Sequence, residues 1–339
     1  MNYYRTVTFQ PPTETLTNFP VLVRIRNDRM GSRILSPKGW DVCFELDGNR
    51  LPFELDWYDA NSGSGAWWVQ IPTLSSSAPT SIKMLYGDAS ITSDQSDPAA
   101  VFAGYDYVYH FTDPDNMKSS VGSYTAVESG NISFTSISAV SNSLTGLGLK
   151  FNQTTGYGDS YAALRIANAV NTSTATFSAF FSNTKVLASD RQFQAQTGWT
   201  NYGFKAAGTN RITYAGGKTN TVSASQDSIF TYGASTKSGT VAWVQNGTVL
   251  DTSSASAGYF RWDNPFISAT GYSSSKPTSF VLDELRLSST TFRSESWLEY
   301  EQLNLAQHDS YTSYGPEFNA DGTPVTSFVP WIYGSMMLD

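Results

Sequence analysis

The sequence predicts an all-β protein of two β-sandwich domains, with a short helix near the C-terminus and an extended C-terminal tail. Three observations favour this fold class. Short runs in which apolar and polar residues alternate recur along most of the chain, separated by turn residues. Only 15% of the residues are charged and 14% are aromatic, and few stretches have the composition of long helices. At 339 residues the chain is long enough for two hydrophobic cores.

The first domain is expected to span residues 1–97. Pro11 and Pro12 end its opening strand, and the polar stretch 90–98 is typical of a linker. Several short strands within about 100 residues are typical of a compact sandwich. Alternating segments predict these strands at residues 2–9, 19–26, 40–46, 51–57, 66–71 and 81–85.

The second domain is expected to span residues 98–316. Asn246-Gly247 is its strongest hairpin signal, because both residues tolerate the positive φ angles of a two-residue turn. Regular short strands separated by turns again indicate a sandwich. The strands are predicted at residues 105–111, 147–151, 174–181, 191–196, 202–206, 211–214, 240–245 and 248–251.

The stretch 278–303 is expected to close the second domain, first as a strand and then as a helix. In simple alternation, the strand has apolar residues on both faces, as in a strand buried inside a sandwich. Phe280 and Leu282 are assigned to one face, and Val281, Leu285 and Leu287 to the other.

Charged residues interrupt this closing strand. Adjacent Asp283 and Glu284 point to opposite faces, so one carboxylate is turned inward and needs a partner. Arg286 shares a face with Glu284 and can pair with it. In the helix that follows, Ser296 and Glu299 have the spacing of a capping box.

Two sets of motifs carry a resemblance to known families. The closing stretch, Leu282-Asp-Glu-Leu-Arg-Leu-Ser288 followed by Arg293-Ser-x-x-Trp-Leu-x-x-Glu301, resembles the end of a laminin-G/concanavalin-A-like jelly-roll domain. The first domain is similar to a domain of unknown function that often precedes this jelly roll. Its marks are Leu16-Thr-Asn-Phe-Pro-Val-Leu-Val23, Trp40-Asp-Val-Cys-Phe44, Leu51-Pro-Phe-Glu-Leu55, Trp68-Val-Gln-Ile-Pro72 and Leu85-Tyr-Gly-Asp88.

The resemblance covers the chain from Tyr4 to the neighbourhood of Gly315. It implies that the second domain is a concanavalin-like jelly roll. This pair of domains occurs in phage tail-fibre proteins and in bacterial surface lectin-like proteins. It specifies architecture better than function, because one fold carries many activities.

Charge and hydropathy exclude several classes of partner. The net charge of −8 argues against nucleic acid, which needs clustered Lys and Arg, and against an anionic membrane surface. No apolar run approaches the roughly 18 residues of a membrane span, and the N-terminus has no apolar signal segment. The Ser-, Thr- and Gly-rich composition suits an exposed surface. We therefore expect a location in the tail or baseplate of a virion, with the bacterial cell surface as the alternative.

Cysteine and histidine give little sign of chemistry. Cys43 is the single cysteine and lies in an alternating strand, so we expect it to be inert. His110 and His308 are too few and too dispersed for a zinc site. His110 is expected to lie in a strand, as a packed or rim histidine rather than a general base. His308 is expected at a helix C-terminus, where a positive charge is favoured.

Paired carboxylates do not complete a catalytic set. Concanavalin-like polysaccharide hydrolases place a Glu-x-Asp-x-Glu set on one strand face. Glu45-Leu-Asp47 and Glu54-Leu-Asp56 supply only the first two members, because Asn49 and Tyr58 stand in the third position. We expect no catalytic residue, no enzyme activity and no required cofactor or metal. A calcium ion held by Asp159 and Asp283 is left open, since loop oxygens suit that ion.

Aromatic residues in predicted loops and strand ends are the candidate ligand contacts. Aromatic faces stack on sugar rings, and turns supply groups that bond hydroxyls. The alternative is that each aromatic is a half-buried residue at the rim of the sandwich. The candidates for carbohydrate or receptor binding are Trp199, Tyr202, Tyr157, Tyr161 and Trp262.

The tail, residues 317–339, differs in character from the sandwiches. It is rich in apolar side chains, which stay ordered only when they are docked on something. Packing on its own domain and packing on a neighbouring subunit both remain open, and rotational symmetry would favour a homotrimer. The residues predicted to mediate assembly are Phe328, Trp331, Ile332 and Tyr333.

Together these observations predict a non-enzymatic tail-fibre or baseplate protein of a virion. The first domain and the tail would organise assembly with other tail proteins. The jelly roll would bind a glycan or pilus on the host surface. Two alternatives stay open, a purely structural virion component without receptor contact and a polysaccharide-degrading enzyme on a concanavalin-like fold.

Overall fold

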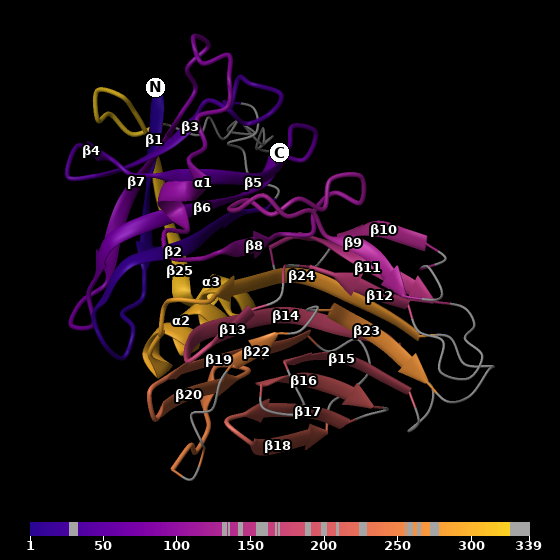
Figure 1. Cartoon of the computed structure of the whole chain (residues 1–339). Helices are drawn as coiled ribbons and strands as arrows, with labels where there is room; N and C mark the ends of the chain where they lie inside the picture. The colour runs from indigo at the N-terminus through magenta and orange to yellow at the C-terminus, as the bar shows by residue number, and fades with distance from the viewer. Residues whose placement is uncertain are drawn as a thin grey trace, which may run out of the picture.

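The computed structural model describes the chain in several ranges. These are residues 1–26, 33–130, 134, 136–141, 145–153, 162–166, 168, 170–186, 191–197, 202–207, 210–223, 229–253, 255, 260–262, 266–271 and 278–325. Within them the protein is mostly β-structure with short helices near the C-terminus and between the sandwiches (Figure 1). The all-β sandwich class predicted from the sequence is confirmed.

The first sandwich packs a five-stranded sheet against a three-stranded sheet. Its strands are β1 (Tyr3–Phe9), β2 (Leu16–Ile25), β3 (Val42–Leu46), β4 (Asn49–Arg50), β5 (Phe53–Asp59), β6 (Ser64–Leu74), β7 (Thr80–Tyr86) and β25 (Thr312–Asn319). The larger sheet has the order β25-β1-β7-β3-β4 and the smaller one β2-β6-β5. Alternate side chains from both sheets, among them Val7, Phe44 and Trp67, form one apolar core.

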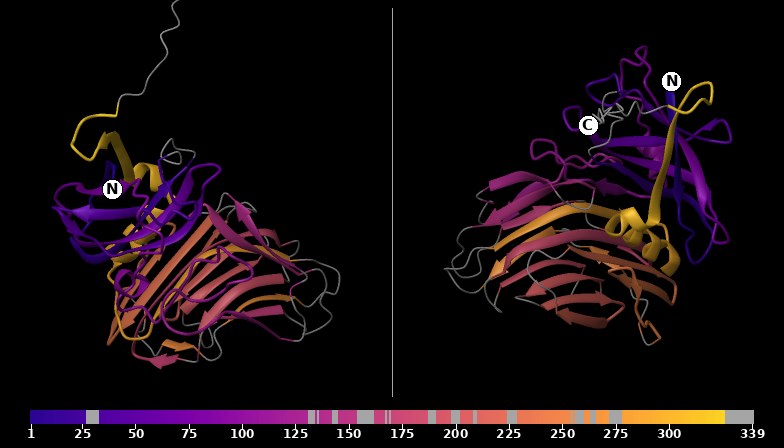
Figure 2. Two further views of the ribbon diagram at one scale, coloured as in Figure 1. Left: turned by 90° about the horizontal axis from the view of Figure 1, so that it is seen from above. Right: turned by 180° about the vertical axis from the view of Figure 1, so that it is seen from behind.

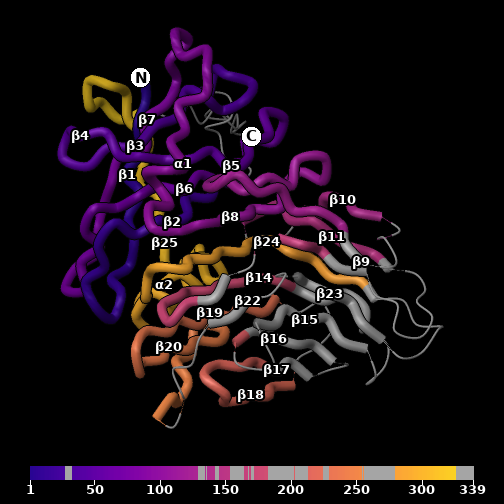
Figure 3. Tube along the Cα trace, viewed as in Figure 1, coloured from indigo at the N-terminus to yellow at the C-terminus, as the bar shows by residue number. Residues whose placement is uncertain are grey.

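The edge of the five-stranded sheet comes from the far end of the chain. β25 pairs with β1 in antiparallel register from Tyr3↔Asn319 to Phe9↔Thr312. The tube in Figure 3 follows the chain from the first sandwich into the second and back to this edge. The first sandwich is thus closed by residues that the sequence assigned partly to the jelly roll and partly to the tail.

The second sandwich packs an eight-stranded sheet against a seven-stranded sheet. The first has the order β10-β11-β24-β14-β19-β20-β21, with β8 also paired to β24, and the second β18-β17-β16-β15-β23-β12-β9; β13 pairs with β22. Their bounds are β8 (Tyr107–Tyr109), β9 (Val127–Gly130), β10 (Ser136–Ser141), β11 (Leu147–Gln153), β12 (Ala162–Arg165), β13 (Val170–Thr172), β14 (Thr174–Val186), β15 (Arg191–Thr197), β16 (Tyr202–Ala207), β17 (Asn210–Ala215), β18 (Lys218–Ser223), β19 (Ile229–Lys237), β20 (Thr240–Gln245), β21 (Thr248–Val249), β22 (Phe260–Trp262), β23 (Phe266–Gly271) and β24 (Thr278–Ser288).

β24 lies inside the eight-stranded sheet, between β11 and β14. The two-faced pattern predicted for this strand is wrong from Asp283 onward. The register with β14 shifts opposite Asp283, since Phe180 pairs with Glu284 but Phe181 pairs with Leu282. This β-bulge turns Leu285 and Leu287 back to the face of Leu282, so all three enter the sandwich core.

The polar residues of β24 take the opposite face, toward the first sandwich, so the prediction that Asp283 and Glu284 point to opposite faces is wrong. Asp283, Glu284 and Arg286 are all buried there. Arg286 pairs with Glu284 as predicted, with Nη2 3.0 Å from Oε2. The bulge therefore separates an apolar face from a charged face within one strand.

Three helices join the sandwiches: α1 (Pro98–Val101), α2 (Glu295–Ala306) and α3 (His308–Tyr311). α2 begins earlier than the predicted capping box. Its N-cap is Ser294, whose side-chain oxygen accepts the backbone N–H of Trp297. Ser296 and Glu299 lie within the helix, and their side chains bond the loop before β2 instead of the helix end.

The two sandwiches meet across a third apolar cluster. It joins Trp68 of β6 and Phe102 after α1 to Val108 of β8, Phe180 of β14 and Leu305 of α2. Figure 2 shows the first sandwich and the C-terminal helices lying against one end of the larger sandwich. Shared burial of this kind makes a fixed relation between two domains the expectation.

Candidate functional site

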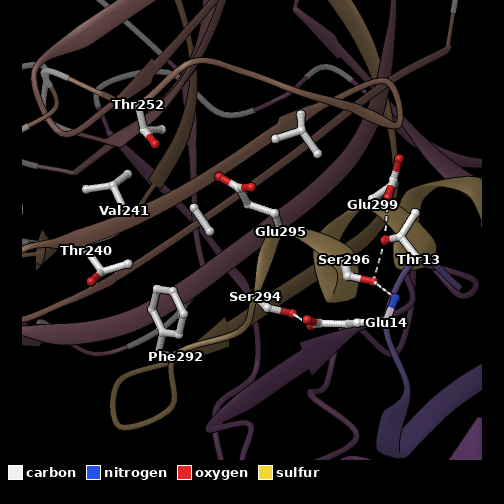
Figure 4. Close-up of a pocket in the computed structure, with 12 residues that line it drawn as sticks. Thr13, Glu14, Thr240, Val241, Thr252, Phe292, Ser294, Glu295, Ser296 and Glu299 are labelled. Atoms are coloured by element: carbon white, nitrogen blue, oxygen red, sulfur yellow. Dashed lines mark hydrogen bonds between the residues drawn. The ribbon is translucent and has the colours of Figure 1, made fainter. Parts of the chain in front are cut away.

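A cleft lies where the start of α2, the β20–β21 edge and the loop before β2 meet (Figure 4). Its volume is about 720 Å³, within the range of small-molecule sites. Hydroxyl, carboxylate and aromatic side chains line it together with short apolar ones. Those with polar or aromatic groups include Thr13, Thr240, Thr252, Glu14, Glu295, Glu299 and Phe292.

The N-cap of α2 builds one wall of this cleft. The Ser294 hydroxyl donates to Glu14 while its oxygen caps the helix. Ser296 Oγ lies 2.7 Å from Thr13 Oγ1 and accepts the backbone N–H of Glu14 at 3.0 Å. Thr13 also donates to Glu299 Oε2 at 3.1 Å. A helix start and a distant loop are thus fastened to each other.

The cleft is acidic. Glu14 and Glu299 accept hydrogen bonds from hydroxyls of the same wall. Glu295 extends from the helix toward the other wall (Figure 4). Burial raises the pKa of Glu295, and the carboxylates of Glu14 and Glu299 raise it further. Such a site favours hydroxyl or amine donors over anions.

A buried set of charges lies between the two sandwiches. We call it the interface charge cluster, and it consists of Glu54, Asp56, His110, Glu284, Arg286 and Glu301. Two strands, the segment after β8 and α2 supply these residues. The cluster packs on an aromatic wall, since the Arg286 guanidinium lies 4.2 Å from the Trp68 ring centroid and His110 stacks on the same ring.

Arg286 is the link from the cluster to the cleft. Its Nη1 lies 2.9 Å from Glu301 Oε1, while Nε and Nη2 face Glu284. Glu301 also accepts the Ser178 hydroxyl at 2.7 Å and the Tyr105 hydroxyl at 3.2 Å. These bonds fix α2 on the eight-stranded sheet, and α2 in turn places Glu295 and Glu299 in the cleft.

His110 connects the two sandwiches directly. Its Nδ1 lies 2.5 Å from Glu284 Oε1 and its Nε2 lies 3.2 Å from Glu54 Oε2. Burial opposes protonation of the ring, but the carboxylates of Glu284, Asp56 and Glu54 outweigh it and hold the His110 pKa well above its usual value. The predicted packed histidine is confirmed, but it lies just after the end of β8 and not in a strand. The sequence did not reveal its carboxylate partners.

Asp56 faces the same ring. Burial raises the pKa of its carboxyl well above the usual range. Ligand atoms of Asp56, His110 and Glu284 lie within 4.8 Å of one another, a spacing that one metal ion could use.

The structure places few of the predicted ligand-contacting aromatics. Tyr202 is fully buried in the core of the second sandwich, so its ring is not offered to a ligand. The reason is its register in β16, which turns it toward the opposite sheet. Trp262 ends β22, where its side chain is not described. Trp199, Tyr157 and Tyr161 lie outside the described residues.

Three other residues singled out in the sequence, Cys43, His308 and Asp283, are buried. Cys43 is buried, and burial raises its thiol pKa to about 11, in keeping with an inert role. The predicted favourable charge on His308 is wrong, because burial lowers its pKa to about 3 and leaves the ring neutral. Asp283 accepts the backbone N–H and hydroxyl of Thr145. Asp159 lies outside the described residues.

The predicted assembly residues fall beyond the last described position, Val325. They are Phe328, Trp331, Ile332 and Tyr333. Among the described residues, no helix is both long and apolar enough to cross a membrane.

Sequence reasoning missed the cleft, because its carboxylates come from a loop and a helix start with no common motif. The interface charge cluster left a signal in the sequence. Glu54, His110 and Glu284 each interrupt an apolar strand or its end, where a charge needs a partner. Their mutual proximity could not be read from spacing, because 174 positions separate His110 from Glu284.

Comparison with known proteins gives one family match. Residues 38–121 match a family described as a domain of unknown function, DUF2341. The matched range contains Glu54, Asp56 and His110, so it extends from the first sandwich into the start of the second. The search of curated proteins found no match.

Several solved structures with detectable likeness are binding domains. The binding domain of Paraclostridial mosquitocidal protein 1 is 10% identical, with a TM-score of 0.41 over 59% of this chain and 52% of that one. The botulinum neurotoxin serotype D binding domain is 9% identical, with a TM-score of 0.38 over 59% and 50%. This chain spans about half the length of those structures. Likeness at this level assigns no ligand to it.

Proposed function

We propose that this chain is a non-enzymatic binding protein of a virion tail fibre or baseplate, with a host-surface glycan as its ligand and the α2 cleft as its binding site. The observation that carries the proposal is the cleft itself. It offers hydroxyls, carboxylates and the Phe292 ring within about 720 Å³. Sugar rings are bound by this combination of an apolar face and hydroxyl-bonding groups.

The negative charge of the cleft favours neutral or cationic ligands over anionic ones. Three carboxylates line it, and the chain carries a net charge of −8. A sialylated or otherwise anionic glycan would be repelled, whereas a neutral or amino-substituted sugar would donate hydrogen bonds to these oxygens. The aromatic residues Trp199, Tyr157, Tyr161 and Trp262 remain predicted additional contacts, and a pilus remains the alternative receptor.

The location and assembly follow the same proposal. The chain would sit in a virion tail or baseplate as a homotrimer beside other tail proteins, with the bacterial cell surface as the alternative. Residues Phe328, Trp331, Ile332 and Tyr333 would make the subunit contact. A bound calcium ion is not required by this proposal.

A glycan array tests the binding. Labelled protein is applied to neutral, amino-substituted and sialylated glycans, with Glu295→Gln and Phe292→Ala as site variants and the exposed Glu128→Gln as a control of equal charge change. We expect binding to neutral or amino sugars that falls at least tenfold in both site variants and persists in the control. Absence of glycan binding, or binding that both site variants retain, would reject the cleft as the receptor site.

A second candidate, hydrolysis of a polysaccharide, is favoured by one observation. Glu295 has a raised pKa beside two other carboxylates, as a general acid beside a nucleophile or base would. Incubation of the protein with bound glycan, followed by assay of new reducing ends, separates the two functions. Release of reducing ends that Glu295→Gln abolishes would establish the enzyme and overturn the non-enzymatic proposal.

A further inference from the structure

Asp56 is the unexplained residue of the interface charge cluster. As a whole residue it is partly buried, but both oxygens of its carboxylate are shut off from solvent. Neither oxygen has a hydrogen-bond partner among the described residues. A buried carboxylate without a donor is strongly destabilising, so such a group either takes up a proton or binds a ligand.

What faces Asp56 is a set of metal-ligand atoms. One ligand atom each from Asp56, His110 and Glu284 lie within 4.8 Å of one another. Ligand atoms around one zinc ion, each at about 2.1 Å, are separated by about 3 to 4 Å. Small side-chain shifts would therefore close the site around an ion, and they would widen the 2.5 Å contact between His110 Nδ1 and Glu284 Oε1.

The neighbours of these three residues fit the roles that surround a metal site. Glu54 Oε2 lies 3.2 Å from His110 Nε2, where it can accept the ring N–H and fix the tautomer. Carboxylates commonly orient metal-bound histidines in this way. Arg286 holds the other oxygen of Glu284 at 3.0 Å, which leaves Oε1 directed at the ring.

The charge of the cluster also favours a cation. Four carboxyl groups, those of Glu54, Asp56, Glu284 and Glu301, face one guanidinium and one imidazole. The guanidinium is fully engaged between Glu284 and Glu301. A divalent ion would supply the missing positive charge among side chains that are largely shut off from solvent.

We propose that Asp56, His110 and Glu284 bind one divalent transition-metal ion, of the zinc or manganese type, that joins the two sandwiches. One imidazole with two carboxylates is a donor set that suits these ions better than calcium, which prefers six or more oxygens. Asp56 comes from β5, Glu284 from β24 and His110 from the segment after β8. The ion would thus be structural, and it would tie the first sandwich to the central strand of the second.

Metal analysis tests the proposal on the full-length, untagged chain. Protein stripped with a chelator is dialysed separately against Zn²⁺, Mn²⁺, Ca²⁺ and Mg²⁺, and bound metal per chain and Tm are measured. We expect one Zn²⁺ or Mn²⁺ per chain and a rise in Tm of about 5 °C at saturating metal. Co²⁺ should give visible absorption typical of nitrogen and oxygen ligands.

Two site variants and a matched control locate the ion. Asp56→Asn keeps the side-chain shape and replaces a carboxyl group that has no partner without metal, so the stripped variant should be at least as stable as the stripped parent. Asp56→Asn and His110→Gln should each lose the bound ion and the rise in Tm. His308→Gln, which changes the only other histidine, should retain both. No stoichiometric metal in the parent, or uptake unchanged in Asp56→Asn, would overturn the proposal.

Discussion

Glu54 Oε2 and His110 Nε2 lie 3.2 Å apart, although Glu54 belongs to the first sandwich and His110 enters the second. This contact shows that the two sandwiches share polar groups as well as apolar surface. The same cluster reaches α2 through Glu301. Because these charges are buried, the stability of the cluster depends on how they are paired more than on how many there are. Removal of one member leaves its partner as an uncompensated buried charge.

The first prediction concerns the centre of this cluster. Arg286→Met should lower the free energy of unfolding by about 3 to 5 kcal/mol, because it leaves Glu284 and Glu301 buried without their cation. Denaturant unfolding at neutral pH measures the loss. The exposed Arg50→Met removes the same charge and should change stability by less than about 0.5 kcal/mol. Equal effects of both variants would mean that the buried ion pairs of Arg286 contribute no more to stability than one exposed positive charge does.

The second prediction distinguishes the observed helix cap from the predicted capping box. Ser294→Ala should lower stability by about 1 kcal/mol, because the N–H of Trp297 loses its acceptor and Glu14 loses a donor. Glu299→Gln should change stability by under about 0.5 kcal/mol, since its amide oxygen can still accept from Thr13. Thermal unfolding of both variants checks the ranking. A larger effect of Glu299→Gln would restore the capping box as the true helix start.

How far the sequence predicts this protein depends on whether the deciding contacts are local. Alternation predicted most strands of the first sandwich and part of those in the second, but β9, β10, β12, β18, β19 and β23 were not predicted. The Asn246-Gly247 turn correctly predicted the β20–β21 hairpin, and both turn residues have the expected positive φ. The bulge at Asp283 could not be predicted, because it depends on the register that β14 imposes on β24. Simple alternation therefore assigned Leu285 and Leu287 to the wrong face.

The candidate site was predictable only in part. The need of Glu284 for Arg286 follows from a two-residue spacing on one strand face. The approach of Glu54 and Asp56 to His110 follows from the packing of two domains, which no spacing encodes. Tyr202 shows the opposite failure. An aromatic at a predicted strand end looked like a ligand contact, but its register turned it into the core.

A third prediction uses the pH dependence of stability. Burial lowers the pKa of His308 to about 3, with Arg24 as the next cause, while Asp309 acts in the opposite direction. The folded pKa lies below the unfolded value of about 6.5. Above pH 6.5 the ring is neutral in both states, so it does not lower the free energy of unfolding there. Stability should fall as the pH drops from about 6.5 toward 3, since the unfolded chain binds the proton first.

His308→Gln removes this titration and keeps a polar side chain near Tyr314 and Arg24. Between pH 6.5 and 5 the parent should lose about 2 kcal/mol more stability than the variant. Denaturant unfolding at both pH values gives the comparison. Identical pH profiles would show that His308 is protonated as easily in the folded chain as in the unfolded one.

The fourth prediction separates backbone strain from packing at two turn glycines. Gly247 and Gly217 have φ angles of +71° and +79°. A Cβ on Gly247 would lie 2.5 Å from Leu303 Cδ2, whereas a Cβ on Gly217 meets nothing within 4 Å. Both Ala variants should lose about 1 kcal/mol from the left-handed backbone. Gly247→Ala should lose about 1 kcal/mol more, because Leu303 has to move. Equal losses in thermal unfolding would show that Leu303 adapts without strain.

The last prediction concerns where the chain can be shortened. A chain that ends at Gly315 loses the half of β25 that pairs with Tyr3, Tyr4 and Arg5. It also loses Glu317, which accepts the Tyr86 hydroxyl at 2.6 Å and pairs with Arg33 at 3.1 Å. An exposed edge of β1 invites strand pairing between molecules, so this chain should unfold at lower temperature and aggregate.

A chain that ends at Val325 keeps all of β25 and the turn in which the Val325 N–H donates to the Glu317 carbonyl. Its Tm should match that of the full chain within about 2 °C. Light scattering then isolates the role of residues 326–339. If Phe328, Trp331, Ile332 and Tyr333 mediate assembly, the Val325 chain is a folded monomer while the full chain is an oligomer. An unchanged mass with an unchanged Tm would refute that role, and it would assign any subunit contact to the sandwiches.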